Sequence, residues 1–494
     1  MKKKLLSLVI MCIMAVSIFF TGCSCSKSGL KDNPPTDANV ISNGGMTVVK
    51  GDYLYYVNGF VDISDANTFG KDDNKFGKVT HGAIYRTKLK KTEVEEPYAD
   101  LITNGEIQKD KDGFLEKTEL VVPKVVGFSN GGFYIIDDYI YYATPNMNYS
   151  RDGELQKNRV EFHRINIDGT NDKTIYTTSK DESKLDWTLY KINNTVYLTA
   201  YVNNTIVIVN TSDKKDVKEI KNVTSYSFLK ETDYKTGMNK PNETQNYIYY
   251  TREFDGDKPN NSYKGNVVCK VEIATGKTTV LEKGLKYSYE IQSVNTDSIY
   301  YFKTDKEISG EKLLNKKDLD TTWTNAEEFE LLQVSYTNYY ICDIGNDLII
   351  ASDSTGTYLI EGNETMKISS SQKAIVGMSG SYAYYYDSNK LYRFDVRSNV
   401  VDGEITIQTM TKDGVTHNIS NENYFDFDGQ RTYVYAQYTA KNGDKNYYLN
   451  YIDNDLNERF VGKFRENDIP AKPDQDENYG KDGYSYIEYT PWID

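Results

Sequence analysis

The 494-residue sequence contains few of the residues that usually carry cross-links or catalysis, with five cysteines, three histidines and three tryptophans. Cys12 and Cys23 belong to an N-terminal export segment described below. The other three, Cys25, Cys269 and Cys342, are too few for a disulfide framework. Because Cys269 lies in a strand-like apolar run, we expect it to be a small buried hydrophobic residue.

The histidines show no spacing that is typical of a metal site; they are His81, His163 and His417. A His-Glu-x-x-His pair is absent, so we interpret them as strand or surface residues. Three acidic loops have the composition of calcium ligands, but none extends to the twelve-residue EF-hand. Ordinary turn chemistry explains them without metal. We therefore expect no cofactor, with structural calcium as the alternative in the loops Asp110–Gly113, Asp255–Asp257 and Asp453–Asp455.

Hydrolase signatures are missing as well. Gly377–Ser381 lacks the last glycine of a G-x-S-x-G nucleophile elbow, and Ser352–Gly356 has the wrong spacing for a sialidase Asp-box. About 30 residues follow the last predicted strand, fewer than a separate hydrolase domain needs. We therefore predict that the protein is not an enzyme. The alternative is a glycoside hydrolase or lyase acting on extracellular glycan, with paired carboxylates in a central funnel.

Long apolar runs are confined to the N-terminus. A mean hydropathy of −0.63 and 26% charged residues exclude a multi-span membrane protein. Acidic residues outnumber basic ones by 72 to 58, which gives a formal net charge of −14. Loss of Lys2–Lys4 with a signal peptide leaves 55 basic residues and a charge of −17. A body with this negative charge repels nucleic acid and anionic lipid headgroups. Nucleic acid is therefore not an expected partner.

Residues 1–22 have the pattern of a lipoprotein signal peptide. A positive region precedes Leu5–Phe20, an uncharged apolar run that is short for a permanent membrane span. The run ends in Phe20-Thr21-Gly22-Cys23, which resembles the bacterial lipobox, with phenylalanine where leucine is usual. The resemblance implies that Cys23 is diacylated and becomes the new N-terminus. The alternative is an ordinary secretory signal with a chance cysteine.

Three regions follow the signal peptide. Residues 23–45 are polar, contain Pro34-Pro35 and lack periodicity, which predicts a flexible tether. Residues 46–465 form the body, and residues 466–494 an acidic tail. Because two acyl chains give stable anchoring, we expect the protein to be held by lipid on the extracytoplasmic face of a bacterial cell membrane.

Tyrosine is abundant, with 44 residues, and many belong to one recurring unit. The unit is a turn of glycine, asparagine or aspartate, followed by an apolar residue and tyrosines. Clear copies are Gly51–Tyr56, Asp137–Tyr142, Gln245–Tyr250 and Thr296–Tyr301. A recurring β unit of this kind predicts a β-propeller. Tandem sandwiches are the alternative, because repeated hairpins do not by themselves establish a closed ring.

Eight such units are spaced along the body, and one apolar marker identifies each: Leu54, Ile140, Val196, Ile248, Ile299, Leu348, Ala383 and Val434. The average spacing of about 54 residues suits a four-stranded blade. In the second unit, for example, we expect the other strands at Val125–Phe128, Phe162–Gly169 and Lys173–Tyr176. No long helical period follows residue 45. The predicted fold is all-β, a single propeller of seven or eight four-stranded blades, with eight favoured.

Consecutive tyrosines fit such blades for a physical reason. Blades pack face to face, so both faces of most strands are covered and apolar or aromatic residues can follow one another directly. A sheet with one wet face would alternate with lysine or glutamate instead. Tyrosine also tolerates these positions because its hydroxyl can reach the polar rim.

The repeat also carries a family resemblance. Ile-Tyr-Tyr followed by a strand such as Leu391–Val396 resembles the propeller of the low-density-lipoprotein-receptor type, whose blades carry Tyr-Trp-Thr-Asp. It is similar as well to bacterial surface lipoproteins built on that propeller. The resemblance covers residues 46–464 and implies the fold. The Trp-Thr-Asp part is replaced, as at Tyr55–Asn58 and Tyr141–Thr144, so bridging between blades by that aspartate is not expected.

Together these features predict a non-catalytic binding or scaffolding protein for an extracellular protein or polymer, with binding residues on loops. One form is glycan binding by exposed aromatic residues in loops and tail, namely Tyr149, Tyr263, Tyr479, Tyr484 and Trp492. Another is an assembly factor that presents sheet edges to client proteins.

The lipid anchor can be tested at Cys23. We predict that Cys23→Ser moves the protein from the membrane fraction to the soluble fraction, because serine cannot accept the acyl chains, whereas Cys25→Ser has no effect. Cell fractionation and immunoblotting measure the distribution. An intact precursor in the membrane would indicate failed processing. A processed protein that stays in the membrane would rule out anchoring at Cys23.

Overall fold

The computed structural model describes the chain between Gly29 and Lys463 in segments. The described residues are 29–36, 44–57, 83–91, 105–106, 118–124, 126, 132–146, 151, 159–179, 185–228, 231–233, 238–240, 246–253, 266–284, 287–295, 298–305, 311–319, 323, 326–335, 339–345, 348–379, 382–387, 390–395, 398, 400–405, 410–412, 415–417, 424–427, 432–439, 445–452, 456 and 458–463. Every regular element among them is a β-strand. These segments accordingly contain no helix of the length and apolar character that a membrane crossing needs.

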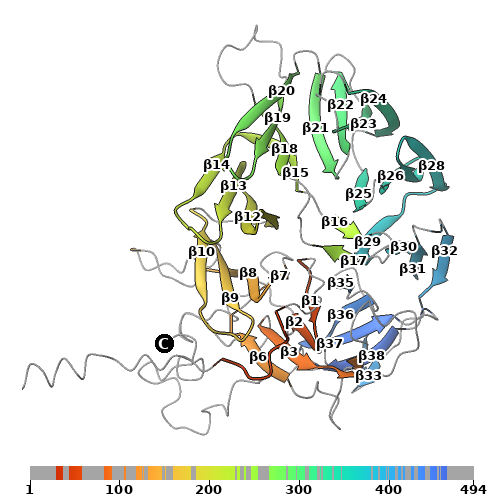
Figure 1. Cartoon of the computed structure of the whole chain (residues 1–494). Helices are drawn as coiled ribbons and strands as arrows, with labels where there is room; N and C mark the ends of the chain where they lie inside the picture. The colour runs from red at the N-terminus through yellow and green to blue at the C-terminus, as the bar shows by residue number, and fades with distance from the viewer. Residues whose placement is uncertain are drawn as a thin grey trace, which may run out of the picture.

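Eight four-stranded antiparallel sheets follow one another along the chain, each with its strands side by side in chain order. Figure 1 shows the sheets arranged in a ring, with the last, β35–β38, beside the first. A closed ring of such sheets is a β-propeller. The prediction of an all-β propeller with seven or eight four-stranded blades is confirmed, and the alternative of tandem sandwiches is wrong.

The first four sheets, named blades 1 to 4, occupy the N-terminal half of the ring. Their strands are β1 (Thr47–Lys50), β2 (Tyr53–Val57), β3 (Ile84–Lys88) and β6 (Thr118–Val122); β7 (Phe133–Ile136), β8 (Tyr139–Pro145), β9 (Val160–Asn166) and β10 (Lys173–Thr177); β11 (Asp186–Ile192), β12 (Thr195–Val202), β13 (Thr205–Asn210) and β14 (Val217–Ile220); and β15 (Val223–Ser227), β18 (Tyr247–Glu253), β19 (Asn266–Glu272) and β20 (Thr278–Lys283).

Blades 5 to 8 complete the ring. Their strands are β21 (Tyr287–Val294), β22 (Ser298–Asp305), β23 (Glu311–Asp318) and β24 (Glu328–Ser335); β25 (Tyr340–Gly345), β26 (Leu348–Asp353), β27 (Gly356–Glu361) and β28 (Glu364–Ser369); β29 (Ala374–Ser379), β30 (Tyr382–Asp387), β31 (Lys390–Asp395) and β32 (Val400–Glu404); and β35 (Tyr424–Phe427), β36 (Thr432–Thr439), β37 (Lys445–Ile452) and β38 (Glu458–Lys463).

Three short hairpins lie in connections between these strands. They are β4 (Lys90–Lys91) with β5 (Gly105–Glu106), β16 (Glu231–Asp233) with β17 (Met238–Lys240), and β33 (Met410–Lys412) with β34 (Val415–His417).

All eight predicted marker residues lie in the second strand of a blade. The seven with described side chains are at most 7% exposed, so they form the centre of each blade. One expected strand is misplaced, because blade 2 begins with β7 at Phe133–Ile136 and not at Val125–Phe128. The two-residue turn Asp137-Asp138, with Asp137 at a φ of 53°, closes a tight hairpin that pairs Ile136 with Tyr139. Such a short turn requires the first strand to end directly before it.

Apolar clusters fill the interfaces between successive blades, and neighbouring residues of one strand enter different clusters. Tyr249 packs between blades 4 and 5, whereas Tyr250 packs between blades 3 and 4. In blade 7, Tyr384 faces blade 8 and Tyr385 faces blade 6. Because side chains alternate along a strand, consecutive aromatic residues cover both faces. The explanation of the paired tyrosines from face-to-face packing is thereby confirmed.

A cation–π contact recurs on the second strand of four blades. In each case the tyrosine that begins this strand lies under an arginine or lysine of the third strand. That basic residue is the cross-strand partner of the tyrosine two positions further along the second strand, as in the pair Tyr55 and Arg86. The distances from the charged group to the ring centroid are 4.4 Å for Arg86 and Tyr53, 4.6 Å for Arg164 and Tyr139, 4.4 Å for Lys270 and Tyr247, and 4.3 Å for Arg393 and Tyr382.

The segment 29–36 lies against blades 1 and 2, and we call it the N-terminal strap. The backbone N–H of Leu30 donates to the carbonyl oxygen of Asp168 at 3.0 Å, and the Thr36 hydroxyl donates to Asp138 at 2.5 Å. Part of the stretch predicted to be a flexible tether is therefore hydrogen-bonded to the body. Residues 23–28 and 37–43 lie outside the described residues.

The packing of a marker residue gives the first stability prediction. Ile299 is fully buried between blades 4 and 5, so we expect Ile299→Ala to lower the free energy of unfolding by about 2–5 kcal/mol through lost burial and a residual cavity. Val280, 44% exposed on an outer strand, provides the control, and Val280→Ala should cost about 0.5 kcal/mol or less. Urea unfolding measures both. Equal losses would contradict the assignment of Ile299 to the core.

Candidate functional site

Most residues singled out from the sequence lie outside the described residues. They are the acylation site Cys23, His81, the three acidic loops and the aromatic candidates Tyr149, Tyr263, Tyr479, Tyr484 and Trp492. His417 lies in β34 and Cys342 in β25. Lipid attachment at Cys23, calcium binding and glycan stacking therefore stay predictions.

Two sequence features have a structural explanation. Cys269 is a fully buried residue of β19 in the cluster between blades 3 and 4, which confirms its prediction as a small core residue. Ser352–Gly356 forms the turn from β26 to β27. Its Asp353 carboxylate accepts hydrogen bonds from the backbone N–H of Thr355 at 2.8 Å and from its hydroxyl at 2.5 Å. The resemblance to an Asp-box therefore reflects ordinary turn chemistry.

His163 lies on β9 at the centre of a polar network in blade 2. The ring is 3% exposed and stacks on Tyr142, with 5.2 Å between the ring centroids. Its Nδ1 lies 3.0 Å from Asp172, and its Nε2 lies 3.2 Å from Glu161. Lys124, from the connection between blades 1 and 2, donates to Asp172 at 2.7 Å. His163 was predicted to be a strand or surface residue, but no sequence pattern indicated its four partners, Tyr142, Asp172, Glu161 and Lys124.

The electrostatics of this network favour an ionised Asp172. Burial by itself raises the pKa of the carboxyl group, but the hydrogen bond from His163 and the charge of Lys124 outweigh burial and hold the pKa well below its usual range. Burial and the neighbouring Asp172 charge raise the pKa of the Tyr142 hydroxyl well above its usual value, so it stays a neutral donor. Both ring nitrogens of His163 face a carboxylate within 3.2 Å, so the ring is held between Asp172 and Glu161.

A second polar network joins blades 4 and 5. Tyr289 and Trp323 both donate to Glu282 on β20, and Tyr301 donates to Glu328 on β24 at 2.6 Å. The aromatic residues are at most 7% exposed, so their rings offer no surface on which a sugar could stack. Within the described residues no group of three or more His, Cys, Asp or Glu side chains is placed to hold a metal ion.

The centre of the ring bears on the enzyme alternative. Figure 1 shows the hairpin β16–β17 in the middle of the ring, away from the blade 4 strands between which it is inserted. The hairpin contacts β25, the inner strand of blade 6. This hairpin occupies part of the space inside the ring, the region in which the alternative of a propeller glycosidase places its paired carboxylates.

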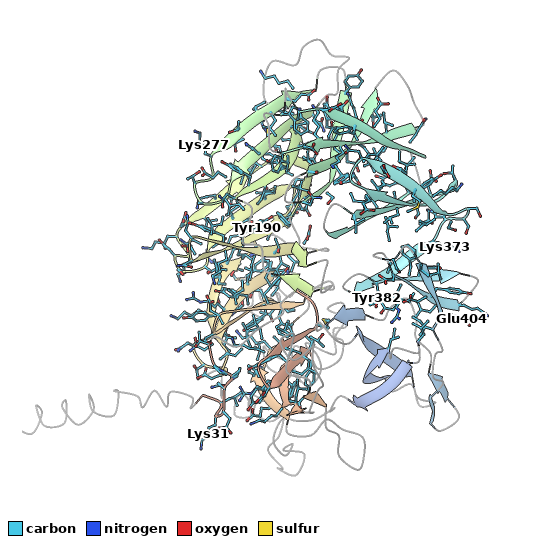
Figure 2. All side chains as sticks on the ribbon, turned by 45° about the vertical axis from the view of Figure 1, so that its right-hand side comes forward. Lys31, Tyr190, Lys277, Lys373, Tyr382 and Glu404 are labelled. Carbon is cyan, nitrogen blue, oxygen red and sulfur yellow. The ribbon has the colours of Figure 1, made fainter. Side chains whose placement is uncertain are left out.

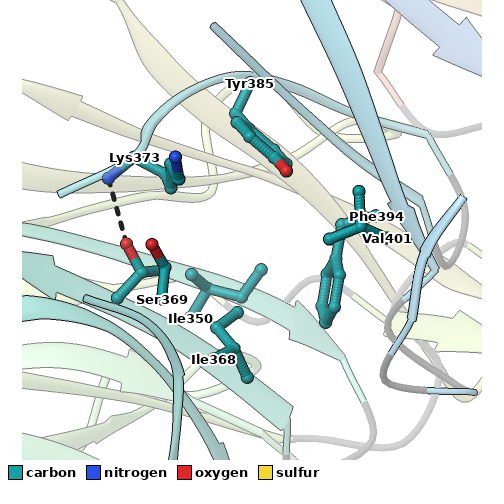
Figure 3. Close-up of a pocket in the computed structure, with 8 residues that line it drawn as sticks. Ile350, Ile368, Ser369, Lys373, Tyr385, Phe394 and Val401 are labelled. Atoms are coloured by element: carbon teal, nitrogen blue, oxygen red, sulfur yellow. Dashed lines mark hydrogen bonds between the residues drawn. The ribbon is translucent and has the colours of Figure 1, made fainter. Parts of the chain in front are cut away.

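A small apolar pocket lies at the outer rim between blades 6 and 7 (Figure 3). Its volume is about 30 Å³, and its apolar walls come from Ile350, Ile368, Tyr385, Phe394 and Val401. The Thr357 hydroxyl accepts a 3.0 Å hydrogen bond from the backbone N–H of Lys373, which ties the link between the two blades to β27.

The outer strands beside this pocket carry large apolar side chains on the surface. Met366 on β28 is 44% exposed, and Val400 and Val401 on β32 are 51% and 47% exposed. β28 and β32 are the last strands of their sheets. We call this surface, formed by Met366, Ile368, Val401 and the pocket, the apolar rim patch, whereas Val400 lies on the opposite face of β32. The sequence feature that could have indicated this surface is the pair Val400-Val401 in β32, because the neighbouring outer strands are largely polar.

Comparison with known proteins adds little to this description. No family model and no curated protein matches the chain. Among solved structures, a prolyl endopeptidase has a TM-score of 0.40 at 11% identity over 66% of this chain and 47% of its own. Oligopeptidase B from Leishmania major has 0.40 at 10% over 67% and 48%, and a puromycin hydrolase 0.34 at 10% over 84% and 59%. The chain spans about half the length of these proteins. The fold assignment rests on the strand topology.

Acid should weaken the His163 network in a defined direction. The pKa of Asp172 is lower in the folded protein than in the unfolded chain. The ionised carboxylate therefore contributes fully to the free energy of unfolding above the unfolded pKa of about 3.9, and this contribution is lost as the pH falls below that value. We expect Asp172→Asn to cost about 2 kcal/mol at neutral pH and to reduce the further loss in acid. Urea unfolding at neutral and acidic pH measures both effects.

The control is Asp216→Asn, since Asp216 is 37% exposed and pairs with Lys218 nearer the surface. We expect that change to cost about 1 kcal/mol or less. An equal loss of stability in acid for the wild type and Asp172→Asn would show that the network does not depend on the ionised carboxylate.

Proposed function

We propose that the protein is a lipid-anchored extracytoplasmic β-propeller that binds another extracellular protein without catalysing a reaction. The observation that carries the proposal is the apolar rim patch on blades 6 and 7. Single exposed apolar residues are common on protein surfaces, but a group of them around an open apolar pocket is typical of an interaction site. Val401 belongs to both, since it is 47% exposed and lines the pocket.

The size of the pocket favours a protein partner over a small molecule. Small-molecule sites usually enclose about 300–1,000 Å³, whereas this pocket has a volume of about 30 Å³. Such a volume suits the tip of one apolar side chain inserted from a larger contact surface. A central apolar anchor surrounded by polar contacts is the usual arrangement of a protein interface.

The edges of β28 and β32 offer a second means of contact. Each is the outermost strand of its blade and can accept an additional strand from a partner through backbone hydrogen bonds. Charged residues on the same strands, such as Lys367, Asp402 and Glu404, limit nonspecific pairing. The proposal therefore favours an extended segment with apolar residues at alternating positions.

The location follows from the sequence. The lipobox at Cys23 supports export and acylation, and the acidic body supports anchoring by lipid and not by a basic patch. Binding of a polysaccharide and hydrolysis of a glycan are the competing functions, and no described contact favours either.

The test is a crosslinking pull-down from intact cells, with the tagged, lipidated protein and analysis of both proteins and sugars. We expect Val401→Asp to reduce the recovered partner about tenfold, which corresponds to about 1.4 kcal/mol of lost contact. The matched control is Val280→Asp, because Val280 is similarly exposed on the outer strand of blade 4. It should leave recovery unchanged.

Two outcomes would contradict the proposal. Equal loss with both variants would show that the apolar rim patch is not the site. Recovery of polysaccharide in place of a protein would favour a glycan-binding or glycan-degrading role.

A further inference from the structure

The N-terminal strap shortens the distance over which the anchor can separate from the body. Met46, the first residue of the predicted body, lies 23 residues after Cys23, and a chain that is free over this length can span about 80 Å. The strap begins at Gly29, only six residues after Cys23, and six residues span about 20 Å at most. The attachment of residues 29–36 to the blades therefore decides how far the propeller can move from an acylated Cys23.

The strap is held at several points along its length. Arg86, fully buried on β3, donates to the Lys31 carbonyl oxygen at 2.7 Å and to the Asn33 side chain at 2.5 Å. Arg86 is itself fixed by a 2.7 Å ion pair with Glu119 on β6. These contacts join the strap to blade 1 through a charged group that has no access to water, where leaving a donor unpaired is costly.

The N-terminal end of the strap is fixed on blade 2. The Leu30 N–H bonds the carbonyl oxygen of Asp168, and Gly29 lies so close to the Asp168 carboxylate that any side chain there would collide with it. Asp168 is held in turn by Thr170, whose N–H donates to its carboxylate at 2.9 Å. Gly29 therefore sits on the rigid turn between β9 and β10, at the outer rim of blade 2.

We infer that the turn between β9 and β10 of blade 2 is the part of the propeller held closest to the membrane, and that blades 6 and 7 are turned away from it. Blade 2 and the pair of blades 6 and 7 lie on opposite sides of the ring in Figure 1. Figure 2 likewise shows Lys31 of the strap on the side opposite Lys373 and Glu404. The apolar rim patch would then face outward, where a partner can reach it.

The inference rests on the proposed acylation of Cys23 and specifies the surface next to the lipid. The blade 2 surface that holds the strap is not a basic patch, since Asp138 and Asp168 contact the strap and Lys191 beside them is paired with Asp137. The orientation is set by the short covalent segment between Cys23 and Gly29 and not by an electrostatic contact.

Energy transfer to labelled lipid tests the orientation. The lipidated protein is purified and reconstituted in phosphatidylcholine vesicles that carry a headgroup acceptor dye. The donor dye is placed at Lys173→Cys or Glu364→Cys, which are exposed first residues of the equivalent strands β10 and β28. Cys25 and Cys342 are replaced beforehand, whereas Cys269 is fully buried and stays.

We expect higher transfer efficiency from position 173 than from position 364. A Gly/Ser insertion after Ser26, three times as long as the segment between Cys23 and Gly29, should abolish the difference because it lengthens the chain without changing the blades. Equal transfer from both positions of the parent protein, or a difference that survives the insertion, would overturn the inference. Flotation of the vesicles and the mass of the N-terminal peptide report separately whether the anchor itself is present, so a missing acyl chain is recognised as failure of the proposed anchoring.

Discussion

The structure depends on the burial, from both sides, of the second strand in the seven blades whose marker side chains are described. Its residues pack alternately into the clusters toward the preceding and the following blade, as Tyr249 and Tyr250 do. Burial of one such side chain stabilises the fold by about 1.5–3 kcal/mol. No blade can bury both faces alone, so each requires its neighbours, and the ring removes the exposed faces that an open row of blades would leave.

Tyrosine suits this position because it combines a large apolar ring with a hydroxyl that must find a partner. Burial raises the pKa of Tyr55 and Tyr249 to about 12, so both stay neutral at physiological pH. The cation–π contacts place the charge of the third strand over the ring that begins the second, as with Arg393 and Tyr382. Charged groups within the blades are therefore paired with aromatic or oppositely charged side chains, and the networks around His163 and Glu282 are further examples.

The proposed anchor and the proposed binding surface fit into one arrangement. The strap joins the N-terminus to blade 2, and the apolar rim patch lies across the ring on blades 6 and 7. Because the ring is rigid, holding blade 2 near the membrane also fixes the position of blades 6 and 7. The short segment between Cys23 and Gly29 is therefore enough to make the patch face outward. The hairpin β16–β17 adds a contact inside the ring, between the connection in blade 4 that carries it and β25 of blade 6.

The amino-acid sequence determined the all-β class, the eight markers and their place in the second strands, because period-two patterns and turn residues are local signals. It also determined the burial of Cys269, whereas the export signal at residues 1–22 stays a prediction. Only the tertiary structure decided that Arg86 meets Lys31 and Asn33, that His163 meets Lys124, and that Val401 stands beside Ile368. These contacts join residues distant in sequence, and the ring that brings them together is fixed by the packing of whole blades, which no single stretch of the chain encodes.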